Sequence, residues 1–61
     1  MILFKATYCD SATRLIDLTR YEGLFETDSE IWGAAAREAA LTYQDRNGVP
    51  YPLDKLECIC Y

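Results

Sequence analysis

The chain has 61 residues, which is enough for one small domain, and 51% of them are hydrophobic, including five Tyr, two Phe and one Trp. This composition argues against disorder, although so short a chain buries only ~60% of the surface that its unfolded form exposes. The net charge of −4 argues against nucleic acid or an anionic membrane as a direct partner, because both require a clustered basic surface. Apolar area left over on so small a body predicts association, either with another protein or with a second copy as a homodimer.

We expect a cytoplasmic protein without an export signal, because Lys5 interrupts the apolar opening run after four residues. No run of residues is long enough to form a transmembrane helix. The three cysteines are an odd number, which is not the pattern of a secreted disulfide framework. Reduced thiols are therefore expected.

Residues 2–9 alternate between two faces, which predicts a strand with one side buried. Residues 10–13 are turn formers whose side chains can bond their own backbone, so the chain is expected to reverse there. Residues 14–22 are ambiguous, and a strand there could continue past a bulge at Gly23 through Leu24-Phe25, to span residues 14–25. Alternation of Ile16 and Leu18 against Asp17 and Thr19 favours a second strand, whereas Asp10 as an N-cap and Gly23 as a stop would fit a helix.

Residues 28–46 form the strongest helical pattern in the chain. Thr27 and Glu30 have the spacing of a capping box, and Asn47-Gly48 supplies a left-handed stop. At 100° per residue, one face of this helix collects the residues expected to cover a sheet. They are Ile31, Trp32, Ala35, Ala36, Ala39 and Tyr43.

Residues 53–61 alternate again and predict a last strand. The predicted fold is α+β, a single β-β-α-β domain over residues 1–61, with strands in the order 2-1-3 and the helix packed on one face of the sheet. The residues expected to form its core are Phe4, Ala6, Tyr8, Ile16, Leu18, Trp32, Ala35, Ala36, Ala39, Tyr43, Leu56 and Cys58.

The sequence offers little for catalysis or metal binding. It contains no His to activate a nucleophile or to complete a four-ligand metal site beside three cysteines. Asp28 and Glu30, at the predicted start of the helix, suit the helix dipole. We therefore expect neither an enzyme nor a cofactor.

The face of the sheet opposite the helix has no second layer in the predicted fold, and a partner is expected to cover it. Tyrosines beyond the needs of one core are typical of interfaces, because a rigid apolar ring carries a polar tip. The predicted protein-binding residues are Tyr21, Tyr51, Tyr61, Ile59, Glu57, Asp17, Glu22 and Glu26.

The passage GLFETDSEIWGAA, followed later by KLECICY, resembles small acidic proteins encoded by bacterial phages and mobile elements. Those proteins share the two-strand, helix, strand plan, and some inhibit bacterial immunity, as anti-CRISPR proteins do. The resemblance implies an anti-defence inhibitor that blocks a host protein sterically or allosterically. The alternative is a structural protein that forms a homodimer through its open sheet face.

Overall fold

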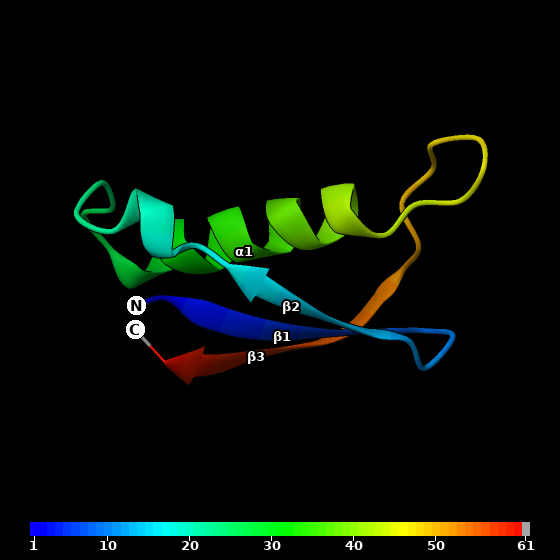
Figure 1. Ribbon diagram of the computed structural model, residues 1–61, viewed down its shortest axis with the longest axis horizontal. Coiled ribbons are helices and arrows are strands. Elements are labelled where there is room, and N and C mark those ends of the chain that lie inside the picture. Colours follow the sequence, from blue (N-terminus) through cyan, green and yellow to red (C-terminus); the bar gives the residue numbers. More distant parts are fainter. Residues whose placement is uncertain (61) are drawn as a thin grey trace.

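The computed structural model describes residues 1–60 as a three-stranded sheet crossed by one helix (Figure 1). In chain order the elements are β1 (Leu3–Tyr8), β2 (Thr13–Asp17), the 3-10 turn η1 (Thr19–Tyr21), α1 (Asp28–Thr42) and β3 (Leu53–Cys60). The strand order is β2-β1-β3, and β1 is antiparallel to both neighbours. The predicted fold class, element order and sheet order are confirmed.

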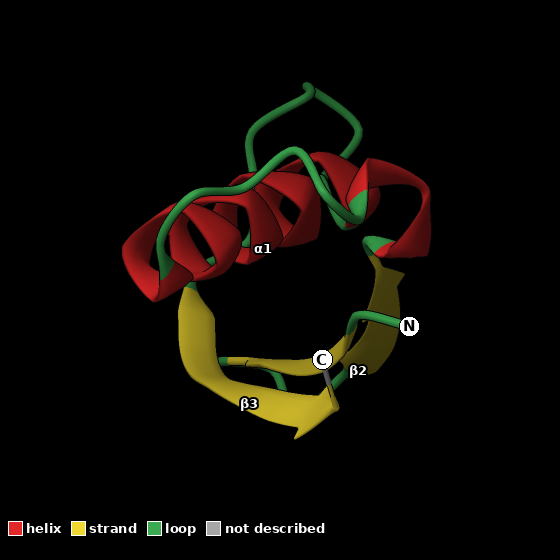
Figure 2. Ribbon diagram, turned by 90° about the vertical axis from the view of Figure 1, so that its left-hand side faces the viewer, coloured by secondary structure: helices red, strands yellow, loops and turns green. Residues whose placement is uncertain are grey.

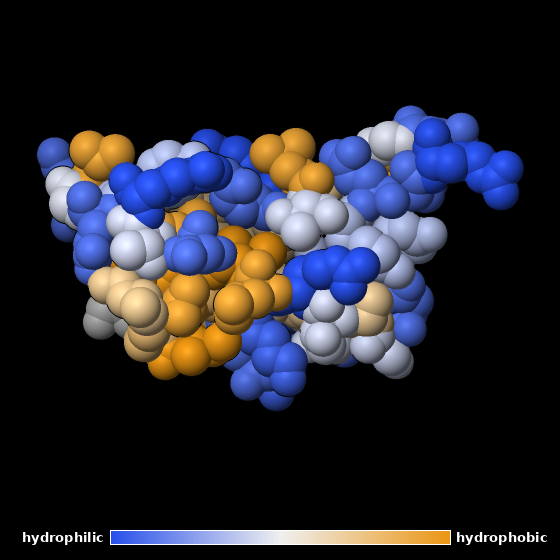
Figure 3. Space-filling model, viewed as in Figure 1, coloured by the Kyte–Doolittle hydropathy of each residue, from blue (hydrophilic) through white to orange (hydrophobic). Residues whose placement is uncertain are grey.

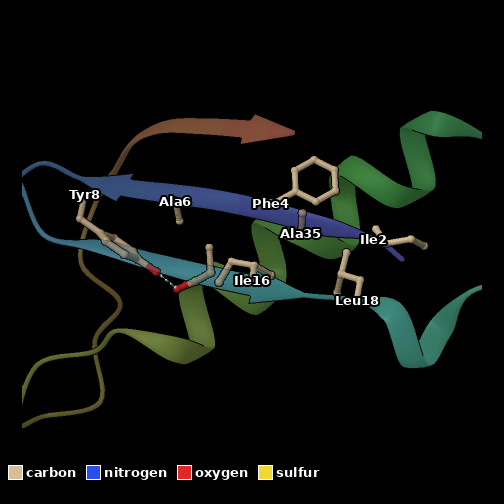
Figure 4. Packing of buried hydrophobic residues seen from close by; sticks show 8 residues of the cluster. Ile2, Phe4, Ala6, Tyr8, Ile16, Leu18 and Ala35 are labelled. Atoms are coloured by element: carbon tan, nitrogen blue, oxygen red, sulfur yellow. Dashed lines mark hydrogen bonds between the residues drawn. The ribbon is translucent and has the colours of Figure 1, made fainter. Parts of the chain in front are cut away.

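The core lies between the helix and one face of the sheet (Figure 4). Alternation along β1 turns Phe4, Ala6 and Tyr8 toward the helix, where each is at most 1% exposed. Ala35 and Ala39, four residues apart on one face of α1, are fully buried against them. Because alanine is small, the helix backbone can lie close to the strands. Ile2, Ile16 and Leu18 complete the buried set.

The sheet is strongly curved, and the helix lies across its concave side (Figure 2). The outer strands β2 and β3 rise on either side of the central strand, as the twist of sheets leads one to expect. The convex side carries no second layer within residues 1–60. This convex side is called the open face from here on.

Two of the predicted core positions are corrected by the structure. Ala36 is exposed, because one residue beyond Ala35 turns it about 100° around the helix, away from the sheet. Trp32 packs edge-on against Phe4, with ring centroids 4.8 Å apart, but remains 37% exposed. Tyr43, Leu56 and Cys58 are half-buried and packed against the core, and Ile2, absent from the predicted core, belongs to it.

The second strand ends at Asp17 rather than at residue 25. The Asp17 carboxylate accepts the backbone N–H of Thr19 at 2.9 Å, and the Thr19 hydroxyl accepts the backbone N–H of Ile2 at 3.1 Å. These side-chain bonds replace ladder bonds and redirect the chain into η1. Gly23, with φ of +87°, then occupies a turn, so the predicted continuation through Leu24-Phe25 is wrong.

The start of α1 is confirmed and its predicted end is wrong. Glu30 N–H donates to the Thr27 hydroxyl at 3.3 Å, and Thr27 N–H donates to the Glu30 carboxylate at 3.0 Å, which is the predicted capping box. The helix stops at Thr42, four residues earlier than expected. Asn47 and Gly48 instead form the tip of a later loop.

That loop, residues 43–51, is a small hairpin projecting beyond the end of the sheet (Figure 1). Gln44 and Pro50 form an antiparallel bridge, and the Asp45 carboxylate accepts the N–H groups of Asn47 and Val49. Gly48 has a φ of +80°, a conformation that glycine adopts at little cost. The Asn-Gly pair is therefore a hairpin turn, not a helix cap.

Candidate protein-binding face

The register of the strands fixes which side chains share the open face. Residues directly opposite in an antiparallel pair point to the same side, so the outward residues of β1 identify their neighbours. Leu3, Lys5 and Thr7 are these outward residues, since Phe4, Ala6 and Tyr8 point inward. Their partners on β2 and β3 are Asp17 and Cys60 for Leu3, Leu15 and Glu57 for Lys5, and Thr13 and Lys55 for Thr7.

Large apolar side chains are exposed on and beside this face. Leu15 is 62% exposed, Ile59 53% and Met1 66%, and Leu3 is half-buried. Figure 3 shows hydrophobic surface gathered over the end of the sheet where the N terminus lies, bordered by hydrophilic side chains. A solvated sheet face is normally polar at such positions. Exposed apolar groups clustered on one face are typical of an interaction surface.

Charged groups border the apolar part of the face. The Lys55 ammonium lies 3.7 Å from the Glu57 carboxylate, and Lys5 is directly opposite Glu57 in the sheet. Asp17 lies at the other margin, beside Leu3. Hydrogen bonds from Thr19 hold the pKa of the Asp17 carboxyl below its ordinary value, so this margin carries a stable negative charge. The face thus combines exposed apolar side chains with two lysines and two acids.

Two of the predicted binding residues, Asp17 and Glu57, share this face through the strand register, and Ile59, the extra residue at the register shift between Cys58 and Cys60, is 53% exposed beside them. Tyr21 does not join them, because it is half-buried against the core with its ring 6.4 Å from that of Phe25. Glu22 forms an ion pair with the N-terminal ammonium and raises the pKa of that amine by accepting its hydrogen bond. The predicted residue Tyr61 lies outside the described part of the chain.

The remaining two predicted binding residues have local structural contacts. Glu26 precedes α1, and its backbone N–H donates to the Glu30 carboxylate at 2.6 Å. Tyr51 is 36% exposed and stacks on Tyr43 at 4.4 Å between centroids, at the end of the sheet from which the hairpin projects. Neither belongs to the open face.

A cluster around Tyr43 joins the hairpin to the sheet and was not foreseen. The Tyr43 ring lies 4.6 Å from that of Tyr8, and the Arg14 guanidinium lies 4.6 Å from the Tyr43 centroid. The Tyr43 hydroxyl donates to the Asp10 carboxylate. This bond lowers the pKa of Asp10, aided by the N–H of Ala12, and raises the pKa of Tyr43. No local spacing predicts a contact between residues 33 positions apart.

A shallow hollow of about 190 Å³ separates η1 from α1 and was also not foreseen. Its lining combines two aromatic rings, one small residue and two opposite charges. The lining residues are Tyr21, Phe25, Ala34, Arg37 and Glu38. The small side chain of Ala34 is the one sequence feature that could have suggested a depression here.

The cysteines do not gather into a site. Cys9 is exposed and its N–H donates to the Pro52 carbonyl at one end of the sheet, whereas Cys60 pairs with Leu3 at the other end. Burial raises the pKa of the half-buried Cys58 thiol, which favours the neutral form. Residues 1–60 contain no group of three or more His, Cys, Asp or Glu side chains placed to hold a metal ion.

No protein-family model, curated protein or solved structure matches this chain. The helix described between residues 1 and 60 is too short and too polar to cross a membrane.

Proposed function

We propose that the protein is a binding module, without catalysis of its own, whose protein partner docks on the open face. The observation that carries the proposal is the exposure of Leu15 and Ile59 on a sheet face that the helix does not cover. Removing apolar surface from water contributes about 25 cal/mol per Å², so a partner that covers these side chains gains affinity from them. Nothing in the packing of the described chain requires them to be apolar.

The border of the face suggests what the partner looks like. Hydrogen bonds from Thr19 lower the pKa of Asp17, and Glu57 lies across the sheet on the other margin. A complementary surface would cover the apolar side chains and present charges of both signs, a basic group toward Asp17 and acidic groups toward Lys5 and Lys55. The resemblance to small phage and mobile-element proteins implies that the partner is a protein of a bacterial host. We therefore include in the proposal that the chain inhibits a bacterial host protein, as anti-defence proteins do, by occupying a site on it.

Self-association is the second candidate, and the same apolar surface favours it. A small domain with exposed leucine and isoleucine on one sheet face gains stability when a second copy covers them. In that case the protein has a structural role and needs no host partner.

Leu15→Glu and Leu41→Glu are a matched pair for testing the proposal. Both leucines are 62% exposed, but Leu15 is on the open face and Leu41 is on α1. Tagged wild type and both variants are used to capture proteins from bacterial lysate, after circular dichroism has shown that each variant is folded. We expect a host protein to be recovered with wild type and Leu41→Glu and lost with Leu15→Glu.

Two results would contradict the proposal. One is capture that Leu15→Glu leaves intact, because binding would then use another surface. The other is recovery of no host protein by the wild type.

A further inference from the structure

The outer edge of β3 is an unpaired strand edge. Within residues 1–60, β3 pairs with β1 alone and is therefore an edge strand of the sheet (Figure 1). Its outward backbone N–H and C=O groups can therefore accept another strand. Such an edge selects its partner through the side chains that face each other across the new pair.

The side chains along β3 are complementary to themselves in one antiparallel register. We propose that a second copy of this chain pairs edge to edge with β3, with Leu56 opposite Leu56 of the partner subunit. In this register Lys55 faces Glu57 of the partner subunit, and the two-fold axis repeats the same pair on the other side. Both charged pairs lie on the open face, and both leucines lie on the concave side.

Neighbouring registers lose this complementarity. Centring the pair on Lys55 or on Glu57 places like charges directly opposite each other, which is unfavourable. The other free edge, β2, offers no equivalent, because centring it on Leu15 pairs Arg14 with Ile16 of the partner subunit. Charge complementarity therefore selects both the edge and the register.

Register shifts and an edge lysine protect β3 from pairing with unrelated strands, and the shifts also limit the length of the proposed contact. Register shifts against β1 occur on either side of the central segment, between Leu3 and Phe4 and between Thr7 and Tyr8. Such bulges and an edge lysine discourage unrelated strands. They leave Lys55–Cys58 as the regular segment, and the Lys55–Glu57 pair within the chain is a surface pair of small energetic weight. The charges can therefore be shared with a partner subunit.

The arrangement would leave Leu15 of the proposed binding surface free, while Glu57 would pair with Lys55 of the partner subunit. Strands paired edge to edge about a two-fold axis perpendicular to the sheet keep both open faces on the same side. Leu15 is on β2, at the far edge of each three-stranded sheet, and stays exposed in each subunit. The inference thus does not rest on the function proposed above, and the two are tested by different substitutions.

The test is the mass in solution, measured by size-exclusion chromatography with light scattering over micromolar to millimolar concentrations. The wild type should reach twice its 7.0 kDa monomer mass. Lys55→Glu places glutamates opposite each other and should weaken the dimer roughly tenfold to a hundredfold. Glu57→Lys should act likewise. The double exchange Lys55→Glu/Glu57→Lys should restore the dimer, because it restores both pairs.

Arg46→Glu is the control for charge reversal, since Arg46 is exposed in the hairpin loop away from β3. It should leave the mass unchanged, and thermal melts confirm that each variant is folded. The second measurement is hydrogen exchange. Alternate backbone amides along Lys55–Cys58 should be protected in the dimer and unprotected in Lys55→Glu.

A wild type that stays monomeric at millimolar concentration overturns the proposal. The proposal is also overturned if Lys55→Glu still forms the dimer, or if the double exchange Lys55→Glu/Glu57→Lys remains monomeric. Loss of the dimer in Leu15→Glu, with Lys55→Glu unaffected, would assign it to the open face instead.

Discussion

At the scale of single residues, Tyr8 links the sheet to the end of the helix. Its side chain is 1% exposed, and its hydroxyl donates to the backbone carbonyl of Ala39 at 2.6 Å. The last four carbonyls of a helix have no partner within it, and Ala39 is the first of the last four residues of α1. Tyr8 therefore satisfies a buried acceptor that the end of the helix leaves free. Burial in turn raises the pKa of its hydroxyl.

Tyr8→Phe should destabilise the fold by about 1–3 kcal/mol, because it leaves the Ala39 carbonyl buried without a donor. The ring and its contact with Tyr43 are kept, so the loss reports the hydroxyl alone. Urea denaturation followed by circular dichroism measures the change in the free energy of unfolding. A variant as stable as wild type would mean that water reaches this carbonyl.

The Asp10–Tyr43 hydrogen bond should make stability depend on pH at both extremes. The pKa of Asp10 is lowered in the folded state, so its contribution is present above the ordinary value of 3.8 and is lost as pH falls through the folded pKa. The pKa of Tyr43 is raised, so its contribution is present below 10.0 and is lost as pH rises through the folded pKa. Thermal melts of wild type and Tyr43→Phe should therefore converge at both ends of the pH range. A constant difference between them would contradict this. Acid loss that comes from Asp17 should remain in both proteins.

At the scale of elements, the helix is defined locally at its start and by distant contacts at its end. The capping box at Thr27 is a three-residue pattern, and for that reason it could be predicted. The end at Thr42 depends on Tyr8 and on the hairpin that follows, where Tyr51 N–H donates to the Tyr43 carbonyl at 3.2 Å. In the sequence, Asn47-Gly48 is the local signal for the end of a helix, whereas the contacts that end α1 join residues far apart in the chain.

The same division explains what else could be predicted. The sheet order followed from the connection rules for a β-β-α-β chain, and alternation in β1 and β3 assigned their residues to the two faces of the sheet. The end of β2 was missed because Asp17 and Thr19 alternate like strand residues while their side chains bond the backbone. Of the candidate site, Asp17, Glu57 and Ile59 were foreseen, since period alone assigns them to a face. Tyr21 packs against the core and the exposed Tyr51 stacks on Tyr43, so their role in binding stays a prediction; aromatic residues suit a core and an interface equally well.

The close approach of α1 to the sheet can be tested with paired alanines. Ala39→Leu should destabilise by about 1–3 kcal/mol through overpacking, because Ala39 is fully buried. Ala36 is exposed on the side of α1 that points away from the sheet. Ala36→Leu should therefore change the free energy of unfolding by no more than about 0.5 kcal/mol. Denaturant melts of both variants check the pair. Equal effects would mean that the helix is rotated from the orientation described.

At the scale of the whole molecule, the core and the proposed binding surface lie on opposite faces of one curved sheet. The concave side holds every residue of the core among residues 1–60, and no buried side-chain nitrogen or oxygen in that part of the chain lacks a hydrogen bond. The convex side holds exposed leucine and isoleucine without a role in that core. A single core in so small a domain supplies only about 3–5 kcal/mol. Substitutions on the concave side should therefore lower the free energy of unfolding, whereas substitutions on the convex side should change it little.

Adjacent residues of β2 provide the comparison. Ile16 is 3% exposed and Leu15 is 62% exposed, on opposite sides of the same strand. Ile16→Ala should cost about 2–5 kcal/mol, which is comparable to the whole stability and should leave much of the protein unfolded at 25 °C. Leu15→Ala should cost about 1 kcal/mol or less, mainly through strand propensity. The two are measured together by urea denaturation of dilute protein, where any dimer is dissociated. If Leu15→Ala were as costly as Ile16→Ala, the open face would be part of the monomer's own core. Its apolar residues would then need no partner to explain them.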